Sequence, residues 1–387
     1  MTVSVRLPGV DGRSVDHTMA EPRYLGAAGA RFTSRIAYAA AHVVAEPLGH
    51  NAPGAPAAVD WDATLRFRHH LWNHGFGVAE AMDTAQRGMG LDWQATQQLI
   101  RRSAAEAHAV GGQIAAGAGT DHLEAGERDL DTITTGYLTQ LEVVEDSGAR
   151  PILMASRQLA AAAGGPDDYH RIYGRILEVS STPVVLHWLG PMFDPALAGY
   201  WGSGDLEEAT DSFVALCADH AARIDGVKVS LLDADHEIAL RRRLPDTVRC
   251  YTGDDFNYPE LIRGDDTGHS DALLGIFAAI APAAATALAA LDRGDLEVYE
   301  EVFSRTVPLA RHVFAVPTFH YKTGIAFLAW LSGHQDGFTM VAGQQAGRSV
   351  PDLVTTFRLA DAAGLLPDPS LAAHRMTSFL EVAGVTP

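Results

Sequence analysis

Two hydrophobic periods alternate along most of the chain. Between about Arg35 and Asp292, short apolar runs alternate with longer segments whose apolar residues recur every three to four positions. The first pattern is typical of buried strands and the second of amphipathic helices. The predicted strands are Arg35–Ala45, Gly77–Met82, Gly112–Gly117, Pro151–Met154, Pro183–His187, Gly226–Val229, Val248–Thr252 and Asp271–Ile276. The predicted helices are Asp62–His74, Asp92–Val110, Leu130–Ser147, Pro166–Val179, Asp205–Ala222, Asp235–Arg243, Tyr258–Arg263 and Pro282–Leu291.

This alternation predicts an α/β fold with a parallel sheet, because a helix must carry the chain back between parallel strands. Eight strand–helix units in roughly 250 residues match a (β/α)8 TIM barrel. A doubly wound open sheet is the alternative, and a Gly-rich phosphate loop after an early strand would favour it. Gly117-Ala118-Gly119 is only a fragment of such a loop, so the barrel is preferred.

The two ends of the chain have other patterns. Thr2–Leu7 and Arg13–Met19 alternate as strands on either side of a turn at Gly9–Gly12, which predicts an N-terminal hairpin. After Asp292 only helical patterns remain. These predicted C-terminal helices are Asp295–Phe314, Tyr321–Leu331, Val350–Ala363 and Pro369–Val382. We therefore expect an N-terminal extension over residues 1–33, a barrel over 34–294 and a helical region over 295–387.

Composition narrows the class of protein. The 387 residues carry a net charge of −19. Nucleic acids and anionic membranes attract basic surfaces, so neither is expected as a partner. Two cysteines without a CxxC pattern indicate a reducing compartment. With no apolar signal core at the N-terminus and no long apolar span, the expected location is the cytoplasm.

The candidate chemistry starts from lysine usage. Of the 29 lysines and arginines, only Lys228 and Lys322 are lysines. Lys228 lies between Val227 and Val229 in a predicted buried strand, where an amine can lose its proton and attack a carbonyl. Two other interpretations remain open: a lysine paired with a buried carboxylate, or one whose amine extends to solvent. Lys322 lies in a predicted C-terminal helix and is expected to be structural.

Other polar residues follow the predicted strands, at the end where barrel enzymes place their chemistry. His187 is a candidate for proton transfer, or a hydrogen-bonded core histidine. Thr84 and Asp83 are candidates for binding substrate oxygens, and Asp254 for binding hydroxyls, although such residues also serve as caps. Arg157 is a candidate anion site or an ordinary surface arginine.

Two groups of residues have side chains that can bind a metal ion. His70 and His74 are spaced by four residues as in zinc-binding helices, but the glutamate of an HExxH motif is absent. The predicted helix lies away from the strand ends, so surface histidines are expected and no metal site is assigned. A ligand pool at the strand ends stays open for a metal-dependent alternative: Asp83, Asp121, His122, His187 and Asp254.

Several of these motifs, in order and in register, resemble the superfamily of dihydrodipicolinate synthase and N-acetylneuraminate lyase, and more narrowly a divergent branch catalogued as a domain of unknown function. Gln113–Gly119 resembles the family's V-I-A-G-T-G run, and Pro183–His187 its P-V-I-L-Y. Gly226–Lys228 is similar to the G-I-K that carries the Schiff-base lysine, and Thr252–Asp255 to S-G-D-D. The resemblance runs from about Arg35 to the C-terminus.

The resemblance implies a class I aldolase in which Lys228 forms an imine, Gly253 approaches the substrate through its backbone, and Thr84 matches a threonine of the G-T-T-G-E loop. The departures are informative. His187 stands at the family's catalytic tyrosine, and Arg157 near another tyrosine. The arginine that clamps a 2-keto acid falls near Met192-Phe193, which argues against pyruvate as the substrate.

The sequence therefore predicts a Schiff-base lyase or aldolase that acts on a small ketose-like or keto-polyol compound without a cofactor. Lys228, His187 and Thr84 are its expected catalytic residues, and Asp83, Arg157, Gly253 and Asp254 its expected substrate-binding residues. Family resemblance also implies a homo-oligomer. The alternatives are a metal-dependent sugar isomerase or class II aldolase on the same barrel, and a barrel that binds a metabolite without turnover.

Overall fold

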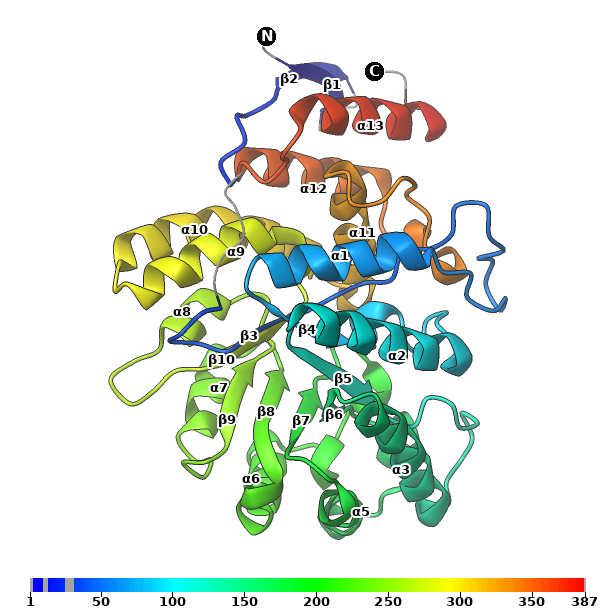
Figure 1. The fold of residues 1–387 in the computed structure, drawn as a ribbon, viewed down its shortest axis with the longest axis vertical. Helices are drawn as coiled ribbons and strands as arrows, with labels where there is room; N and C mark the ends of the chain where they lie inside the picture. The colour runs from blue at the N-terminus through cyan, green and yellow to red at the C-terminus, as the bar shows by residue number, and fades with distance from the viewer. Residues whose placement is uncertain (1–2, 10–12, 25–30, 386–387) are drawn as a thin grey trace. The chain divides into compact units, whose positions relative to one another are not determined.

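The computed structural model describes residues 3–9, 13–24 and 31–385 and divides into two compact units (Figure 1). The barrel unit comprises residues 35–41 and 76–275. The helical unit comprises the described parts of residues 1–34, 42–75 and 276–387. Each unit thus combines segments that are distant in the sequence.

Eight parallel strands in the barrel unit close into a barrel, which confirms the predicted (β/α)8 fold. Each strand pairs with the next one in the sequence, and the last pairs with the first. Their small and β-branched residues suit a sheet whose two faces are both buried. The strands are β3 (Ala37–Ala40), β4 (Gly77–Glu80), β5 (Ile114–Ala118), β6 (Arg150–Leu153), β7 (Val184–Leu189), β8 (Ile224–Ser230), β9 (Arg249–Thr252) and β10 (Asp271–Leu274).

Aspartates begin most of the long helices of the barrel unit. The carboxylates of Asp92, Asp129, Asp205 and Asp233 each accept a hydrogen bond from a backbone N–H of the first turn, which satisfies a donor that has no partner within the helix. The helices are α2 (Trp93–Val110), α3 (Leu130–Asp146), α4 (Arg157–Ala162), α5 (Pro166–Val179), α6 (Leu206–Asp219), α7 (Ala234–Arg241) and α8 (Tyr258–Arg263). Short 3₁₀ turns are η1 (Asp83–Ala85), η2 (Pro195–Leu197), η3 (Tyr200–Gly202) and η4 (Ala221–Arg223).

Side chains from alternate strand positions fill the barrel interior. This core contains Tyr38, Ala40, Ala79, Met82, Ala115, Ile152, Val185, Tyr251 and Leu273. Because side chains alternate between the two faces of a strand, residues two positions from a core residue face the same way. Strand register places Lys228 opposite His187 on one side and Tyr251 on the other. Lys228 and His187 therefore point into the barrel.

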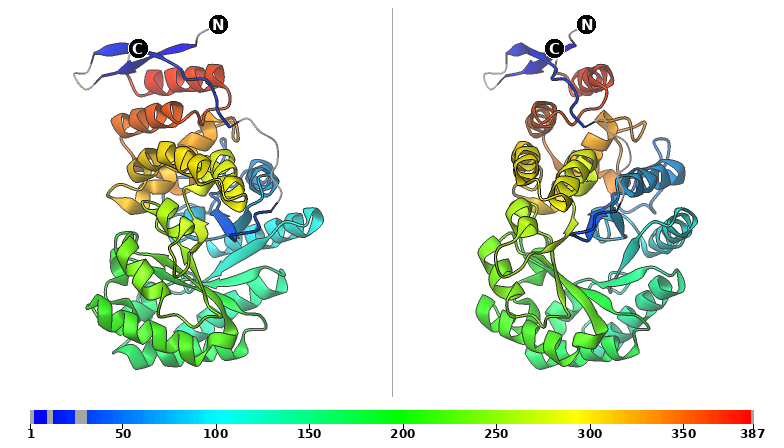
Figure 2. Two further views of the ribbon diagram at one scale, coloured as in Figure 1. Left: turned by 90° about the vertical axis from the view of Figure 1, so that its left-hand side faces the viewer. Right: turned by 60° about the vertical axis from the view of Figure 1, so that its left-hand side comes forward.

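The helical unit contains the predicted N-terminal hairpin and C-terminal helices. The hairpin pairs β1 (Ser4–Pro8) with β2 (Ser14–Thr18), and residues 10–12 of its predicted turn at Gly9–Gly12 lie outside the described residues. His17 Nε2 and Asp361 Oδ2 are 2.8 Å apart, and Figure 2 shows the hairpin beside α13. The helices are α1 (Trp61–Asn73), α9 (Phe277–Asp292), α10 (Leu296–Val313), α11 (Tyr321–Leu331), α12 (Val350–Ala362) and α13 (Pro369–Val382), with 3₁₀ turns η5 (Thr318–His320) and η6 (Val341–Gly347).

The structure differs from the prediction at the first strand, at helix α9 and at helix α4. The first strand, expected over Arg35–Ala45, ends at Ala40, although the residues after it remain buried. Helix α9 begins at Phe277 rather than Pro282, because a non-helical Ile280 accommodates the proline within it. Helix α4 was not predicted; the Ser156 hydroxyl accepts a hydrogen bond from Leu159 N and begins it.

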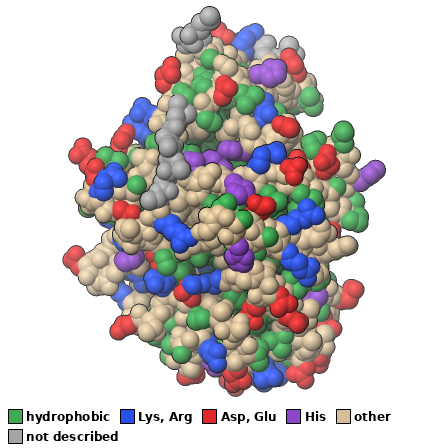
Figure 3. Space-filling model, in the orientation of Figure 1, with side chains coloured by type: hydrophobic (Ala, Val, Ile, Leu, Met, Phe, Trp, Pro, Cys, Tyr) green, Lys and Arg blue, Asp and Glu red, His purple; other side chains and the backbone are tan. Residues whose placement is uncertain are grey.

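The surface carries acidic and basic side chains side by side, as the face in Figure 3 shows. Over the described ranges, no helix has both the length and the apolar character needed to cross a membrane.

Candidate functional site

The Lys228 side chain enters the barrel from the middle of β8. Its neighbours Val227 and Val229 point the other way and are buried, so the strand is held on both faces. Lys228 is only 6% exposed. The amine therefore does not extend to solvent, and burial lowers its pKa because the charged form loses its hydration.

Two carboxylates act on this amine. Asp83, in turn η1 after β4, and Asp255, after β9, both oppose the effect of burial on the Lys228 pKa. The site therefore combines a buried amine with two nearby carboxylates. Such a group can hold a proton on the amine, release it to a neighbouring carboxylate, and then present the neutral nucleophile.

His187 lies beside Lys228 on β7 and is 1% exposed. Burial lowers the pKa of this imidazole well below its usual range, and the nearby charge of Lys228 lowers it further. The ring is thus neutral near pH 7 and available as a proton acceptor. Its Nε2 is 3.1 Å from Ser230 Oγ, a residue that was not predicted as part of the site.

Gly253 fits its place because it has no side chain. A β-carbon built there would lie 2.1 Å from Ser230 Oγ and 2.8 Å from Lys228 Cε. The Gly253 backbone N–H also donates to Val229 O, at 2.7 Å. The glycine backbone therefore packs directly against the lysine side chain.

The adjacent aspartates after β9 have different environments. Asp254 was the predicted substrate-binding residue, but its carboxylate accepts hydrogen bonds from Phe256 N at 2.8 Å, Asn257 N at 3.0 Å and Asn257 Nδ2 at 2.9 Å. These hydrogen bonds use the Asp254 carboxylate to stabilise its own loop. Of this adjacent pair, Asp255, which is 3% exposed, is the one that acts on Lys228.

Arg87, also not predicted, fixes the loop that carries Asp83 and Thr84. Its Nη1 donates to Gly117 O at 2.7 Å and to Ala81 O at 3.2 Å, which joins the ends of β5 and β4. Its other nitrogens donate to the side chains of Asp121 and Gln140. Thr84 itself is buried within η1.

Arg157 lies apart from the buried groups. It is the first residue of α4, its side chain is 55% exposed, and its guanidinium pairs with Asp194. An incoming anion would have to compete with that carboxylate. The structure therefore brings together Lys228, His187, Gly253 and Asp83, while Arg157 and Asp254 have partners elsewhere.

The ligand pool of the metal-dependent alternative is divided in the same way. Asp121 is bound to Arg87, and His122 Nδ1 lies 2.7 Å from Gln140 Nε2. Among residues 3–9, 13–24 and 31–385, no three His, Cys, Asp or Glu side chains are arranged to hold a metal ion.

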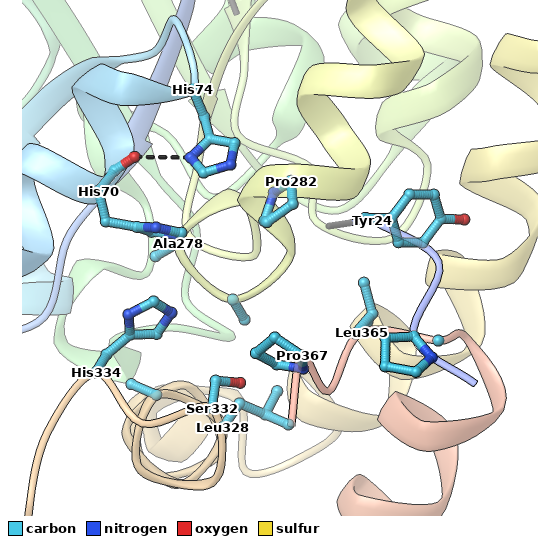
Figure 4. A pocket seen from close by; sticks show the side chains of 14 residues that line it. Tyr24, His70, His74, Ala278, Pro282, Leu328, Ser332, His334, Leu365 and Pro367 are labelled. Atoms are coloured by element: carbon cyan, nitrogen blue, oxygen red, sulfur yellow. Dashed lines mark hydrogen bonds between the residues drawn. The ribbon is translucent and has the colours of Figure 1, made fainter. Parts of the chain in front are cut away.

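The predicted surface histidines of α1 instead line a cavity in the helical unit (Figure 4). The cavity has a volume of about 240 Å³. His70 lies between His74 and His334 and its ring is tilted against both, with ring centroids 4.5 and 4.3 Å away. Burial is the main cause that lowers the pKa of His70 to about 3 and of His334 to about 4. The His70 and His334 rings are therefore neutral near pH 7.

The fold and this arrangement define a (β/α)8 barrel with a buried lysine on its sixth strand. The chain matches the family model described as "Protein of unknown function (DUF993)" over residues 5–385 and belongs to that family. No curated protein matches the chain.

Similar solved structures are dihydrodipicolinate synthases, which confirms the fold resemblance expected from the sequence motifs. The enzyme from Oceanobacillus iheyensis has a TM-score of 0.65 at 16% identity, covering 86% of this chain and 96% of that one. The enzyme from Bacillus clausii has a TM-score of 0.66 at 14% identity, covering 85% and 97%. The chloride-inhibited enzyme from Acinetobacter baumannii, complexed with pyruvate, has a TM-score of 0.63 at 19% identity, covering 86% and 100%.

Proposed function

We propose that this protein is a Schiff-base-forming lyase or aldolase that acts on a small hydroxylated ketone. The observation that carries the proposal is the Lys228 amine, buried in the barrel between His187 and two carboxylates. A barrel that only binds a metabolite has no need for a buried amine, whose desolvation is costly.

The chemistry follows from the groups present. Asp83 or Asp255 takes a proton from the ammonium, and the neutral Nζ attacks the substrate carbonyl carbon. The carbonyl oxygen gains two protons and leaves as water, so that a protonated imine remains. This cation withdraws electrons from the adjacent bonds, and a carbon–carbon bond there can break or form. His187 is the proposed proton acceptor.

The two carboxylates near Lys228 favour a hydroxylated substrate over one that carries a carboxylate. A 2-keto acid bound to Lys228 would carry its carboxylate into the field of Asp83 and Asp255. At about 5 Å and an effective dielectric constant near 20, each such repulsion is about 3 kcal/mol. Carboxylates instead accept hydrogen bonds from hydroxyl groups. We therefore propose a ketose or keto-polyol, with Asp83 and Thr84 orienting its hydroxyls.

Borohydride trapping tests the proposal, and the chain suits it because Lys228 and Lys322 are its only lysines. The protein is incubated with dihydroxyacetone, other ketoses or pyruvate, reduced, and digested with trypsin. A reduced adduct on Lys228 blocks cleavage there, so the peptide Ile224–Arg241 remains whole. It gains the mass of the ketose less one oxygen atom, because the imine forms with loss of water and is then reduced. Lys322→Arg is the matched control, since that lysine is also buried, at 3% exposure.

We expect the adduct with ketoses in the wild type and in Lys322→Arg, and none in Lys228→Arg. A wild-type adduct with pyruvate but with no ketose would contradict the substrate class. If no carbonyl compound forms an adduct, and a divalent metal confers activity, the metal-dependent alternative replaces the proposal.

A further inference from the structure

We propose that the Ser230 hydroxyl is the proton carrier between His187 and the substrate held on Lys228. The inference rests on the proposed Schiff-base chemistry and assigns a catalytic residue to it.

The position of Ser230 is set by β8. Ser230 is two residues after Lys228, so both side chains point into the barrel. Its Oγ lies 3.1 Å from His187 Nε2. The β-carbon built at Gly253 approaches both Ser230 Oγ, at 2.1 Å, and Lys228 Cε, at 2.8 Å. The hydroxyl and the lysine side chain therefore border the same glycine.

Burial gives this hydroxyl its role. Ser230 and His187 are each 1% exposed, so bulk water has little access to the imidazole. The Ser230 hydroxyl in contact with the imidazole, rather than bulk water, is therefore placed to pass it a proton from the substrate. A hydroxyl suits this, because it donates one proton and accepts another without a net change of charge.

In the protonated imine, a C–H bond next to the imine carbon breaks, and its electron pair forms the C=C bond of an enamine. The former C=N π pair returns to nitrogen. The released proton passes to Ser230 Oγ while the Ser230 hydroxyl proton passes to His187 Nε2. Serine is regenerated, and reversal of the step returns a proton to carbon.

The net charge of the buried site does not change during this proton transfer. The positive charge on the imine nitrogen disappears as the positive charge on the imidazole appears. The charge at Lys228 is one cause of the low pKa of His187. Its loss in the enamine makes the imidazole more basic at the moment when it must accept the proton.

Hydrogen exchange tests the relay without knowledge of the natural substrate. Dihydroxyacetone is incubated with the protein in D2O, and deuterium uptake at the carbon atoms next to its carbonyl group is followed by mass spectrometry. For Ser230→Ala we expect exchange to fall about 100-fold, the usual scale for loss of proton transfer. The borohydride adduct on Lys228 should form as in the wild type, because imine formation does not use the relay.

Two further variants separate a relay from a structural hydroxyl. Ser230→Cys keeps a transferable proton and should exchange faster than Ser230→Ala. The double variant of Ser230→Ala with His187→Gln should exchange no slower than the slower single variant, because both residues act in one path.

Exchange within threefold of the wild type in Ser230→Ala, or effects of the two substitutions that multiply, would overturn the relay. If Ser230→Ala does not fold, Ser230→Cys decides alone: exchange comparable to that of His187→Gln overturns the relay. A wild type without any adduct would overturn the proposed function, and the relay with it. An intact adduct with undiminished exchange overturns the relay alone.

Discussion

A single methyl group at Gly253 should disrupt the site more than its size suggests. In Gly253→Ala the new carbon would lie 2.1 Å from Ser230 Oγ, 2.8 Å from Lys228 Cε and 2.8 Å from Val229 O. Non-bonded heavy atoms pack at about 3.5–4.0 Å, so neighbours must move by roughly an ångström. One of them is a backbone carbonyl in β8, which cannot escape by changing a rotamer.

Overpacking of this kind costs about 1–3 kcal/mol, which should lower the thermal midpoint by several degrees. The effect on chemistry should be larger. Displacement of a reacting group by about 1 Å can reduce rates on the order of 100-fold, and both Lys228 and Ser230 would be displaced. We expect the borohydride adduct with dihydroxyacetone to form far more slowly in Gly253→Ala.

Gly126→Ala is the matched control. Nothing lies within 4 Å of the β-carbon built there, and its backbone is outside the left-handed region. Its midpoint and its rate of adduct formation should equal those of the wild type. Scanning calorimetry and timed trapping measure both quantities. If Gly253→Ala behaves like Gly126→Ala in both assays, the close packing of Gly253 against the lysine is refuted.

Three further outcomes are expected. Burial lowers the pKa of His42 to about 4, so between pH 6.5 and about 4 the unfolded chain binds a proton at His42 that the folded chain does not. The free energy of unfolding should therefore fall by about 3 kcal/mol over this range. Urea unfolding of His42→Gln should show a smaller fall than that of the wild type. Burial raises the pKa of Glu237 to about 8, so the folded chain holds a proton there that the unfolded chain loses, and stability falls as the pH rises from 4.5 to 8. At pH 8, Glu237→Gln should therefore unfold at a higher temperature than the wild type. At pH 4 it should have no such advantage. Arg87→Met leaves Asp121 and two carbonyl groups without their cation and should lower the midpoint by several degrees, since breaking a buried pair costs about 3–5 kcal/mol; an unchanged calorimetric midpoint would contradict this.

The barrel was predictable because the sequence patterns of its strands and helices are local and repeat eight times. Strand and helix periods, and aspartates such as Asp92 and Asp205 before helices, depend on neighbours in the sequence. The position of Lys228 followed from counting strands. Helix α4 was missed because it is only six residues long, too short for a helical period to be visible.

The rest of the site depends on contacts that no local pattern reports. Arg87 binds Asp121 and Gln140, which are 34 and 53 residues away. Loop geometry, rather than residue type, determines that Asp255 acts on the amine while Asp254 holds its own turn. Ser230 could have been predicted from the sequence. It lies two positions after Lys228 on the same strand, so its side chain must point to the same face as the lysine.

The use of arginine for surface charge has a consequence in the presence of reactive carbonyl compounds. Lys228 and Lys322 are 6% and 3% exposed, and the chain has no other lysine. Reducing sugars damage proteins by glycation, which begins when a surface lysine amine condenses with the sugar. Here the lysine amines are withdrawn from the surface. In a solution rich in ketoses, the protein should accumulate little lysine glycation.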